Sequence, residues 1–351
     1  MPFHRLRNGK TAPNLVLVGN FGAGNIGDEL ILAGFLKKIG KELPRAKVCV
    51  LAGNPHLVRR FHGVDALPHL PTGWRSFWKS GWLVRRSLSG RGEGWMRSLR
   101  KIREADAVIF PGGGLFTDEE SFHAILIWGI HLLVARYFWK PVFLLGQSIG
   151  PITGIYAQNF TRFCLRKAEW IGVRDSASAS ELKKLGIPAK KVKLGRDTSF
   201  WLVNRIPKTR EIKKRGVLKI LVSARSFPKI EEEFFAEFGR ALDQISERTH
   251  ARISFAEFGK GDAAVWQKIC RHSKHARLWK TLELPESAEG VVRAVNKFDL
   301  VIGMRLHSLV AAQLAGTPAI GLAYSRKVKE FAEKSLAVEN FSAEKLVEIL
   351  S

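Results

Sequence analysis

Short apolar segments alternate with amphipathic segments along most of the chain. In the N-terminal half a longer amphipathic segment, residues 27–43, follows the first apolar segment and has the spacing of a helix. The apolar segments of strand length in this half are 14–19, 47–53, 106–114, 141–151 and 170–175. Because continuous apolar strands separated by helices are typical of parallel sheets covered on both faces, this half predicts a Rossmann-like domain.

The same alternation resumes in the C-terminal half, with strand-like segments at 217–226, 252–259, 299–308 and 317–325. Residues 203–216 are polar and basic and contain Pro207, which is typical of an interdomain linker. We therefore expect an α/β fold of two Rossmann-like domains facing a cleft. The predicted parts are a basic N-terminal tail (1–13), an N-terminal domain (14–202), a linker (203–216) and a C-terminal domain (217–351).

One apolar run, residues 122–138, approaches the length needed to span a bilayer. His123, His131 and Arg136 interrupt it, and charged or ionisable residues are costly in a membrane. The run therefore predicts a buried helix that leads into the strand at 141, with a membrane span as the alternative.

Composition and motif spacing indicate the cellular compartment and bear on whether disulfides or metal sites are present. The three cysteines form no C-x-x-C pair, and His272 and His275 stand among cations, so we expect neither disulfides nor a metal site. The basic start of the chain lacks the apolar stretch of a secretory signal. These features predict a cytoplasmic location.

The formal net charge of +25 indicates a surface that attracts anions, whether nucleic acid, acidic lipid or phosphorylated substrates. Residues 74–103 interleave four of the ten tryptophans with lysines and arginines. We expect this segment to contact an anionic membrane, which would place the protein on the inner face of the plasma membrane. A basic loop over an active site, a nucleic-acid surface and an ordinary solvated face are the alternatives, and no nucleic-acid partner is expected.

The stretch GNFGAGNIGDE (19–29) contains the G-x-G-x-x-G spacing of dinucleotide-binding turns. A nicotinamide cofactor is not expected, because the next strand ends at Asn54 without the acidic residue that binds ribose. In addition, Asp28 and Glu29 occupy the first turn of the following helix and would repel a pyrophosphate. The two carboxylates either cap the helix or bind sugar hydroxyls and act as a general base.

A second glycine turn, PGGGLF (111–116), also follows a strand and precedes Asp118. Its three flexible residues place backbone amides at the carboxyl edge of the sheet, as a wall for a hydroxylated ligand; a plain tight crossover is the alternative.

Cations gather at the predicted carboxyl edge of the C-terminal sheet. Arg305 and His307 follow one strand and would point the same way if the chain stayed extended. Lys327 and Arg225 follow two other strands of the same sheet. Together they predict an anion site, which Gln147 and Arg174 would approach from the other domain.

With these residues in place, the chain resembles the polysaccharide pyruvyl transferase family, which includes enzymes that pyruvylate cell-wall polymers. The resemblance covers nearly the whole chain and rests on an ordered series: GNIGDE (24–29), PGGGLFTD (111–118), GQSIGPI (146–152), VRDSASASELKKLG (173–186), RDTSF (196–200), GMRLHSLVAAQLAGTP (303–318) and YSRKV (324–328). It implies a fold similar to GT-B glycosyltransferases. It also implies transfer of pyruvate from phosphoenolpyruvate to a saccharide, as a ketal, without a further cofactor.

The resemblance implies roles for the candidate residues. The donor side is Arg305, His307, Lys327 and Arg225, and the acceptor side is Asn25, Gly27, Asp28, Gly112, Gly113, Gly114, Asp118, Gln147 and Arg174. His307 would be the acid or a phosphate ligand, and Asp28 or Glu29 would position or deprotonate the acceptor, which we expect to be lipid-linked.

The chain departs from the family pattern in three places. Asp197 is followed by Thr198 where relatives often have proline, and Arg326 also stands where proline is frequent. The segment 252–262 matches poorly, which gives little reason to assign a role to Asp262. The alternatives are a GT-B glycosyltransferase that uses a nucleotide sugar, and a non-catalytic basic protein that binds membrane or nucleic acid.

Overall fold

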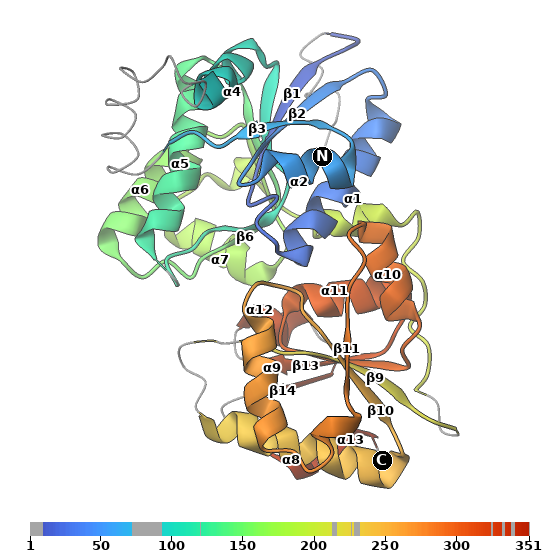
Figure 1. The fold of residues 1–351 in the computed structure, drawn as a ribbon. Helices are drawn as coiled ribbons and strands as arrows, with labels where there is room; N and C mark the ends of the chain where they lie inside the picture. Colours follow the sequence, from blue (N-terminus) through green and yellow to red (C-terminus); the bar gives the residue numbers. More distant parts are fainter. Residues whose placement is uncertain are drawn as a thin grey trace. The chain divides into compact units, whose positions relative to one another are not determined.

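The structure, a computed structural model, describes residues 10–71, 93–119, 121–212, 216–225, 227, 232–323, 326–331, 334–337 and 341–350 (Figure 1). The described chain divides into two compact units. The first contains the described residues up to Ala23 and those from Asp28 to Leu202. The second contains Gly24–Gly27 and the described residues from Val203 onward. Each unit is built on its own parallel sheet, which confirms the α/β, GT-B-like fold class.

The first unit has a parallel sheet whose main path runs β3-β2-β1-β4-β6-β7-β8, with β5 paired to β6. Its strands are β1 (Asn14–Val18), β2 (Lys47–Ala52), β3 (Asp65–Pro68), β4 (Ala107–Phe110), β5 (Gly113–Phe116), β6 (Val142–Ile149), β7 (Trp170–Val173) and β8 (Val192–Leu194). The strand order reverses between β1 and β4, which are hydrogen-bonded neighbours. Such a reversal opens a ligand-binding crevice at the carboxyl ends of the two strands.

Helices cover both faces of this sheet. The helices are α1 (Ile26–Glu42), α2 (Pro55–His62), α4 (Glu93–Glu104), α5 (Phe122–Tyr137), α6 (Ile155–Leu165) and α7 (Ser176–Lys184), with short 3₁₀ helices η3 (Ala189–Lys191) and η4 (Thr198–Leu202). Leu15 and Leu17 of β1 pack with the buried residues of α1 and α2, whereas Val16 and Val18 pack with those of α4 to α7. The alternation along β1 thus divides one strand between two cores.

The apolar run at 122–138 forms α5, as the buried-helix interpretation predicts. In the part of the chain that the structure describes, no helix is long and apolar enough to cross a membrane.

The second glycine turn differs from the expected simple strand-and-turn. β4 ends at Phe110, and the chain re-enters the sheet as β5, where Gly113 pairs with Gln147 and Phe116 with Ile149 of β6. Gly112 and Gly113 take φ values of 154° and 97°, which other residues rarely adopt, so glycine allows this sharp change of partner strand.

The second unit has a parallel sheet with the order β11-β10-β9-β12-β13-β14. Its strands are β9 (Lys219–Ser223), β10 (Arg252–Ala256), β11 (Lys280–Leu282), β12 (Leu300–Gly303), β13 (Ala319–Ala323) and β14 (Lys334–Ala337). In chain order this is the 3-2-1-4-5-6 arrangement of the Rossmann fold, and it reverses between β9 and β12.

The helices of this unit are α8 (Glu232–Thr249), α9 (Asp262–Arg271), α10 (Ala288–Asn296), α11 (Leu306–Ala315), α12 (Arg326–Phe331) and α13 (Ala343–Leu350), with the 3₁₀ helix η5 (Ala276–Leu278). Ile220 and Val222 of β9 pack against buried residues of α8, α9 and α13. Part of the segment expected to be a linker is fixed to this unit: the Arg210 N–H donates to the Gly316 carbonyl (2.9 Å), and its guanidinium donates to the carbonyls of Asn296 and Phe298.

Three glycines of the first unit make room for residues 196–199. A Cβ at Gly34 would collide with the carbonyl oxygen of Thr198, and one at Gly112 would lie 3.0 Å from the Thr198 hydroxyl. A Cβ at Gly146 would lie 3.1 Å from the backbone of the same segment. The Thr198 hydroxyl donates to the Pro111 carbonyl at 2.5 Å, an interaction that proline at 198 would lack. The departure from the family pattern at 198 therefore has a local hydrogen-bonding role.

Gly34 and Gly40 of α1 offer a matched pair of substitutions. We expect Gly34→Ala to lower the free energy of unfolding by about 2 kcal/mol or more, because its Cβ has no room against Thr198. Gly40→Ala meets nothing within 4 Å and should stabilise the helix by about 0.5–1 kcal/mol. Urea unfolding of both variants measures the difference; equal effects would contradict this packing.

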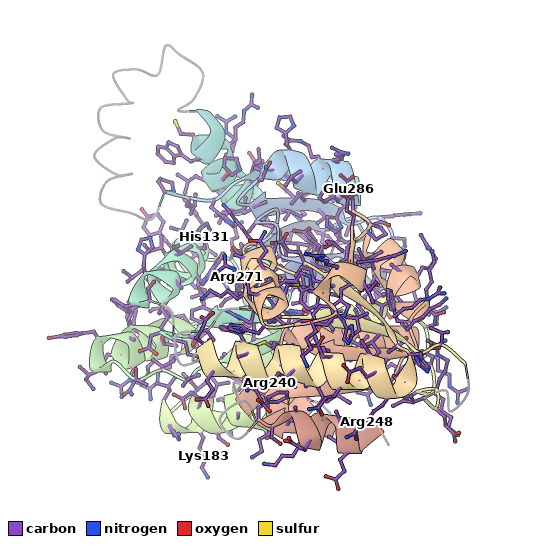
Figure 2. All side chains as sticks on the ribbon, turned by 60° about the horizontal axis from the view of Figure 1, so that its bottom comes forward. His131, Lys183, Arg240, Arg248, Arg271 and Glu286 are labelled. Carbon is purple, nitrogen blue, oxygen red and sulfur yellow. The ribbon has the colours of Figure 1, made fainter. Side chains whose placement is uncertain are left out.

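Two histidines of the first unit lie close together: His131 is fully buried and His69 is half-buried, with their ring centres 5.2 Å apart. The Nδ1–H of His131 in α5 (Figure 2) donates to the Ile127 carbonyl (2.8 Å), and its Nε2 accepts from the Leu70 N–H (3.0 Å), which requires the neutral ring. Burial lowers the pKa of His131 to about 4 and that of His69 to about 3.

This burial predicts acid sensitivity. In the unfolded chain both rings have a pKa near 6.5, so below that pH the unfolded state binds protons that the native state does not. Stability should therefore be constant above about pH 6.5 and should fall by about 2 kcal/mol per histidine on going to about pH 5. Urea unfolding at both pH values tests this, and His131→Leu should weaken the pH dependence; an unchanged slope in that variant would contradict the assignment.

Candidate functional site

The candidate residues of the first unit gather at the carboxyl ends of β1 and β4, where the strand order reverses. The Asp28 carboxylate is buried and accepts from the Asn20 side-chain amide at 2.9 Å. A Cβ built at Gly113 would lie 3.6 Å from Oδ1 of Asp28, so the two glycine turns of this unit approach each other at this carboxylate. Asn25 and Gly27 belong to the second unit, and Asn25 Oδ1 accepts from the Gly27 N–H (3.1 Å) in the turn that begins α1.

Glu29, the neighbour of Asp28, holds the glycine turn in place. Its Oε1 accepts from the Gly22 N–H at 2.7 Å, and its Oε2 lies 2.7 Å from Nε2 of His62. Both oxygens of this buried carboxylate are therefore engaged. Of the two acids predicted as general base, Glu29 therefore holds the glycine turn, and the role of Asp28 stays a prediction.

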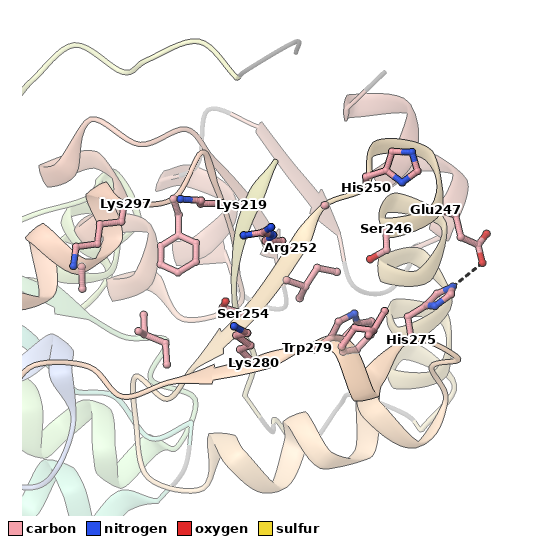
Figure 3. A pocket seen from close by; sticks show the side chains of 16 residues that line it. Lys219, Ser246, Glu247, His250, Arg252, Ser254, His275, Trp279, Lys280 and Lys297 are labelled. Atoms are coloured by element: carbon pink, nitrogen blue, oxygen red, sulfur yellow. Dashed lines mark hydrogen bonds and ion pairs between the residues drawn. The ribbon is translucent and has the colours of Figure 1, made fainter. Parts of the chain in front are cut away.

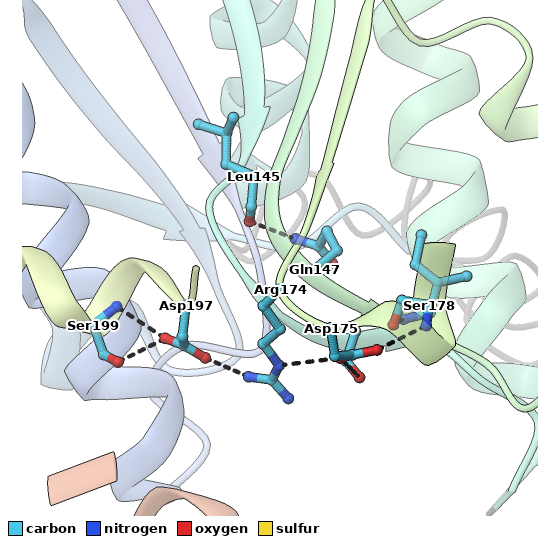
Figure 4. Close-up of polar contacts among 9 residues, drawn as sticks. Leu145, Gln147, Arg174, Asp175, Ser178, Asp197 and Ser199 are labelled. Carbon is cyan, nitrogen blue, oxygen red and sulfur yellow. Dashed lines mark hydrogen bonds and ion pairs between the residues drawn. The ribbon is translucent and has the colours of Figure 1, made fainter. Parts of the chain in front are cut away.

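Gln147 and Arg174 lie on neighbouring strand ends of the same sheet (Figure 4). The Gln147 side chain is fully buried and donates to the Phe110 carbonyl at 3.0 Å, which ties β6 to the end of β4. The Arg174 guanidinium is paired with the buried carboxylate of Asp197 and lies 3.9 Å from Asp175. Asp197 also accepts from the N–H and hydroxyl of Ser199. The RDTSF motif thus supplies the carboxylate that orients Arg174, a role that the sequence reasoning did not assign.

Asp118 anchors a surface turn. Its carboxylate accepts from the Thr153 N–H (2.9 Å) and the Gly154 N–H (2.8 Å), immediately before α6. Gly114 lies within β5 and is exposed. Asp118 therefore stands beside the turn at the start of α6.

The candidate cations of the second unit lie where its strand order reverses. Gly303 of β12 is the partner of Ser223 of β9, and Arg305 and Arg225 each follow two residues later. The register therefore brings these two arginines to adjacent strand ends. Arg225 lies 6.0 Å from the ring centre of Phe227, measured from its guanidinium carbon.

The expected extended geometry of Arg305 and His307 is wrong. Arg305 is the N-cap of α11, and the helix begins at Leu306, so His307 lies in its first turn. The strand alternation used for the prediction ends at Gly303. A Cβ at Gly27, which belongs to the same unit, would collide with the imidazole of His307, so residue 27 must be glycine where this ring sits.

Asp262 is the ion-pair partner of Arg305, although the poor family match of residues 252–262 offered little reason to assign it a role. Its carboxylate receives Nε and Nη2 of Arg305, at 3.0 and 2.5 Å, and the N–H groups of Phe258 and Gly259. Burial raises the pKa of Asp262, and the ion pair with Arg305 opposes that shift. The pair uses one edge of the guanidinium, and Nη1 makes no hydrogen bond to a described residue. The free edge is suited to an anion.

Two of the predicted sites lie partly or wholly outside the described residues. The side chain of Lys327 is not described, although its backbone belongs to α12. Of the 74–103 segment, residues 74–92 are also outside the description, and the remainder forms α4. Among the residues that the structure does describe, no group of three or more histidine, cysteine or acidic side chains has the geometry to hold a metal.

Known proteins resemble the chain in sequence and in fold. The amylovoran biosynthesis protein AmsJ of Erwinia amylovora is 25% identical over 358 aligned positions, covering 89% of this chain and 84% of AmsJ. HepE of Anabaena, solved with UDP-glucose, matches with a TM-score of 0.59 at 14% identity, covering 96% of this chain and 88% of HepE. A putative UDP-N-acetylglucosamine 2-epimerase of Listeria monocytogenes matches with a TM-score of 0.62 at 14% identity, covering 97% and 87%. At these identities the solved structures establish the fold alone.

A family model also matches this chain, from residue 25 to residue 326. The match begins in the glycine turn before Asp28 and ends at the start of α12, so it includes the candidate residues of both units except Lys327. The chain is thus a transferase of polysaccharide biosynthesis and belongs to the polysaccharide pyruvyl transferase family.

Proposed function

We propose that this protein transfers pyruvate from phosphoenolpyruvate to a lipid-linked saccharide and closes a ketal on two of its hydroxyls. The observation that carries the donor assignment is the pair Arg225 and Arg305 at the strand reversal of the second unit, beside the amino end of α11. Phosphoenolpyruvate carries a phosphate and a carboxylate on three carbons. Two guanidinium groups and a helix amino terminus supply the charge-assisted donors that such a small anion needs.

The proposed reaction has two stages. His307 protonates the methylene carbon of the donor, which leaves oxocarbenium character at C2, and a sugar hydroxyl adds there and loses its proton to Asp28. The C2–O bond to phosphate then breaks, and phosphate leaves with the bonding electrons and takes the proton held by Asp28. The second hydroxyl adds to C2 and returns its proton to His307. One pyruvyl ketal and one inorganic phosphate form for each donor consumed.

The contacts of Arg305, Asp28 and Arg174 support the separate roles proposed for them. Asp262 fixes the Arg305 guanidinium through one edge, which leaves Nη1 for the donor. In the first unit, Asp28 stands at the meeting of two glycine turns, where backbone N–H groups and a carboxylate suit sugar hydroxyls. Asp197 orients Arg174 at the neighbouring strand end.

Phosphate release tests the proposal. Purified protein is incubated with phosphoenolpyruvate and a lipid-linked disaccharide, and in parallel with UDP-glucose and the same acceptor. We expect phosphate release from phosphoenolpyruvate only when acceptor is present, with a matching gain of one pyruvyl group in the product by mass spectrometry. If UDP-glucose were turned over and no phosphate were released from phosphoenolpyruvate, the proposal would be wrong, and the protein would be a glycosyltransferase that uses a nucleotide sugar.

A further inference from the structure

The second unit contains a cavity of about 830 Å³ that the proposed reaction does not use (Figure 3). Residues at the amino ends of β9, β10 and β11 line it, together with residues near the C-terminal ends of α8 and α10. Arg225 and Arg305 lie beyond the opposite, carboxyl ends of the strands. Since β10 alone runs from Arg252 to Ala256, the two ends are separated by roughly 13 Å of strand.

Polar and basic side chains at the amino ends of the strands make up part of the cavity lining. Along β10, Ile253 and Phe255 belong to the core formed with α8 and α9, whereas Arg252 and Ser254 point to the other face. Arg252, Ile253 and Ser254 all line the cavity. The register places Arg252 beside Lys219 and Ser254 beside Lys280. A strand that alternates in this way is typical of a sheet with one face left accessible.

The walls of the cavity are largely apolar. Leu278 is 75% exposed, and it lines the cavity with Trp279, Leu282 and Phe298. The indole Nε1 of Trp279 is buried and has no hydrogen-bond acceptor in the described part of the chain. Apolar walls of this kind gain free energy by enclosing a hydrocarbon group.

The rim of the cavity is basic. It carries four cations, Lys219, Arg252, Lys280 and Lys297, and none of them forms an ion pair with a described residue. Among the described residues that line the cavity, Glu247 is the one carboxylate, and it is paired with His275 at 2.9 Å, drawn as the dashed line in Figure 3. These positive charges therefore favour the binding of an anion at the rim.

We propose that this cavity binds a membrane lipid through the lipid's phosphate, with the cations on the phosphate and the apolar walls around the adjoining chain. A free phosphate would use the rim alone, and a neutral hydrocarbon would use the walls alone. A lipid phosphate uses both. This assignment is independent of the transfer reaction, because it involves other residues at the other end of the sheet.

Calorimetric titration with soluble short-chain lipids tests the site. The probes are dihexanoyl phosphatidic acid, dihexanoyl phosphatidylcholine and glycerol phosphate, all below the concentration at which the lipids form micelles. We expect phosphatidic acid to bind at least about tenfold more tightly than either of the others. Equal binding of glycerol phosphate would reduce the site to a phosphate site, and equal binding of phosphatidylcholine would remove the role of the cations; either result overturns the proposal.

Two charge-reversal variants distinguish binding at this site from attraction by the overall positive charge of the protein. Lys280→Glu changes the rim, whereas Lys183→Glu makes the same change on the exposed surface of α7 in the first unit (Figure 2). We expect the first to weaken phosphatidic acid binding at least about tenfold and the second to leave it within about twofold. Leu278→Ser should also weaken it, and because Leu278 is exposed that variant should remain folded. Equal losses in the two charge reversals would show binding by net charge and overturn the proposal.

Discussion

Replacing Arg305 by methionine is expected to lower kcat/KM for phosphoenolpyruvate by about 100-fold or more, which corresponds to about 3 kcal/mol of transition-state stabilisation. Methionine keeps most of the length of the side chain and removes the charge. The guanidinium is 18% exposed and held by Asp262, so little of its charge is screened by water and its orientation is fixed before the donor binds. The measurement is initial-rate phosphate release over a range of donor concentrations.

The single variant also leaves the Asp262 carboxylate, which is 1% exposed, without its cation. Removing one partner of a buried ion pair typically costs about 3–5 kcal/mol, so loss of folding could mimic loss of activity. The double variant Arg305→Met, Asp262→Asn keeps an acceptor for the Phe258 and Gly259 N–H groups and removes the orphaned charge. We expect it to be more stable than the single variant and equally inactive. A folded double variant with the native kcat/KM would exclude Arg305 from the donor site.

Substitution of Asp28 by asparagine is expected to reduce kcat by about 100-fold to 1000-fold, while KM for phosphoenolpyruvate changes by less than about threefold. Asparagine retains the shape and can still accept from the Asn20 amide, so the glycine turn should persist. The lost function is proton transfer from the acceptor hydroxyl. Steady-state kinetics with both substrates varied separates the effect on kcat from that on KM.

Glu29→Gln is the matched control for Asp28→Asn. Glutamine can still accept from the Gly22 N–H and face His62, so kcat should stay within about threefold of the native value. Comparable losses in both variants would mean that the effect of Asp28 is structural, and full activity of Asp28→Asn would remove it from the mechanism.

Most of the fold follows from short-range patterns. The apolar segments at 14–19 and 47–53 become the parallel neighbours β1 and β2, and the run at 122–138 becomes α5. Here burial on both faces imposes an apolar pattern that the sequence displays directly. The acidic first turn of α1 after a glycine turn could also be predicted, because it is a local feature of the sequence.

The contacts that the sequence could not reveal join distant segments. Arg305 and Asp262 are 43 positions apart, and only the tertiary fold brings the start of α9 next to the N-cap of α11. Likewise, Asp197 reaches Arg174 through a turn that docks on Gly34, Gly112 and Gly146. The error at His307 arose because the start of α11 lacks a capping side chain, so nothing in the residue types marked the end of the extended chain.

The donor assignment is tested most directly by a crystal structure of the protein with phosphoenolpyruvate. We predict donor density at the amino end of α11, with the phosphate or carboxylate oxygens within hydrogen-bonding distance of the Arg305 and Arg225 guanidinium groups. Donor density instead at the glycine turns of the first unit, with these two arginines unoccupied, would contradict the account.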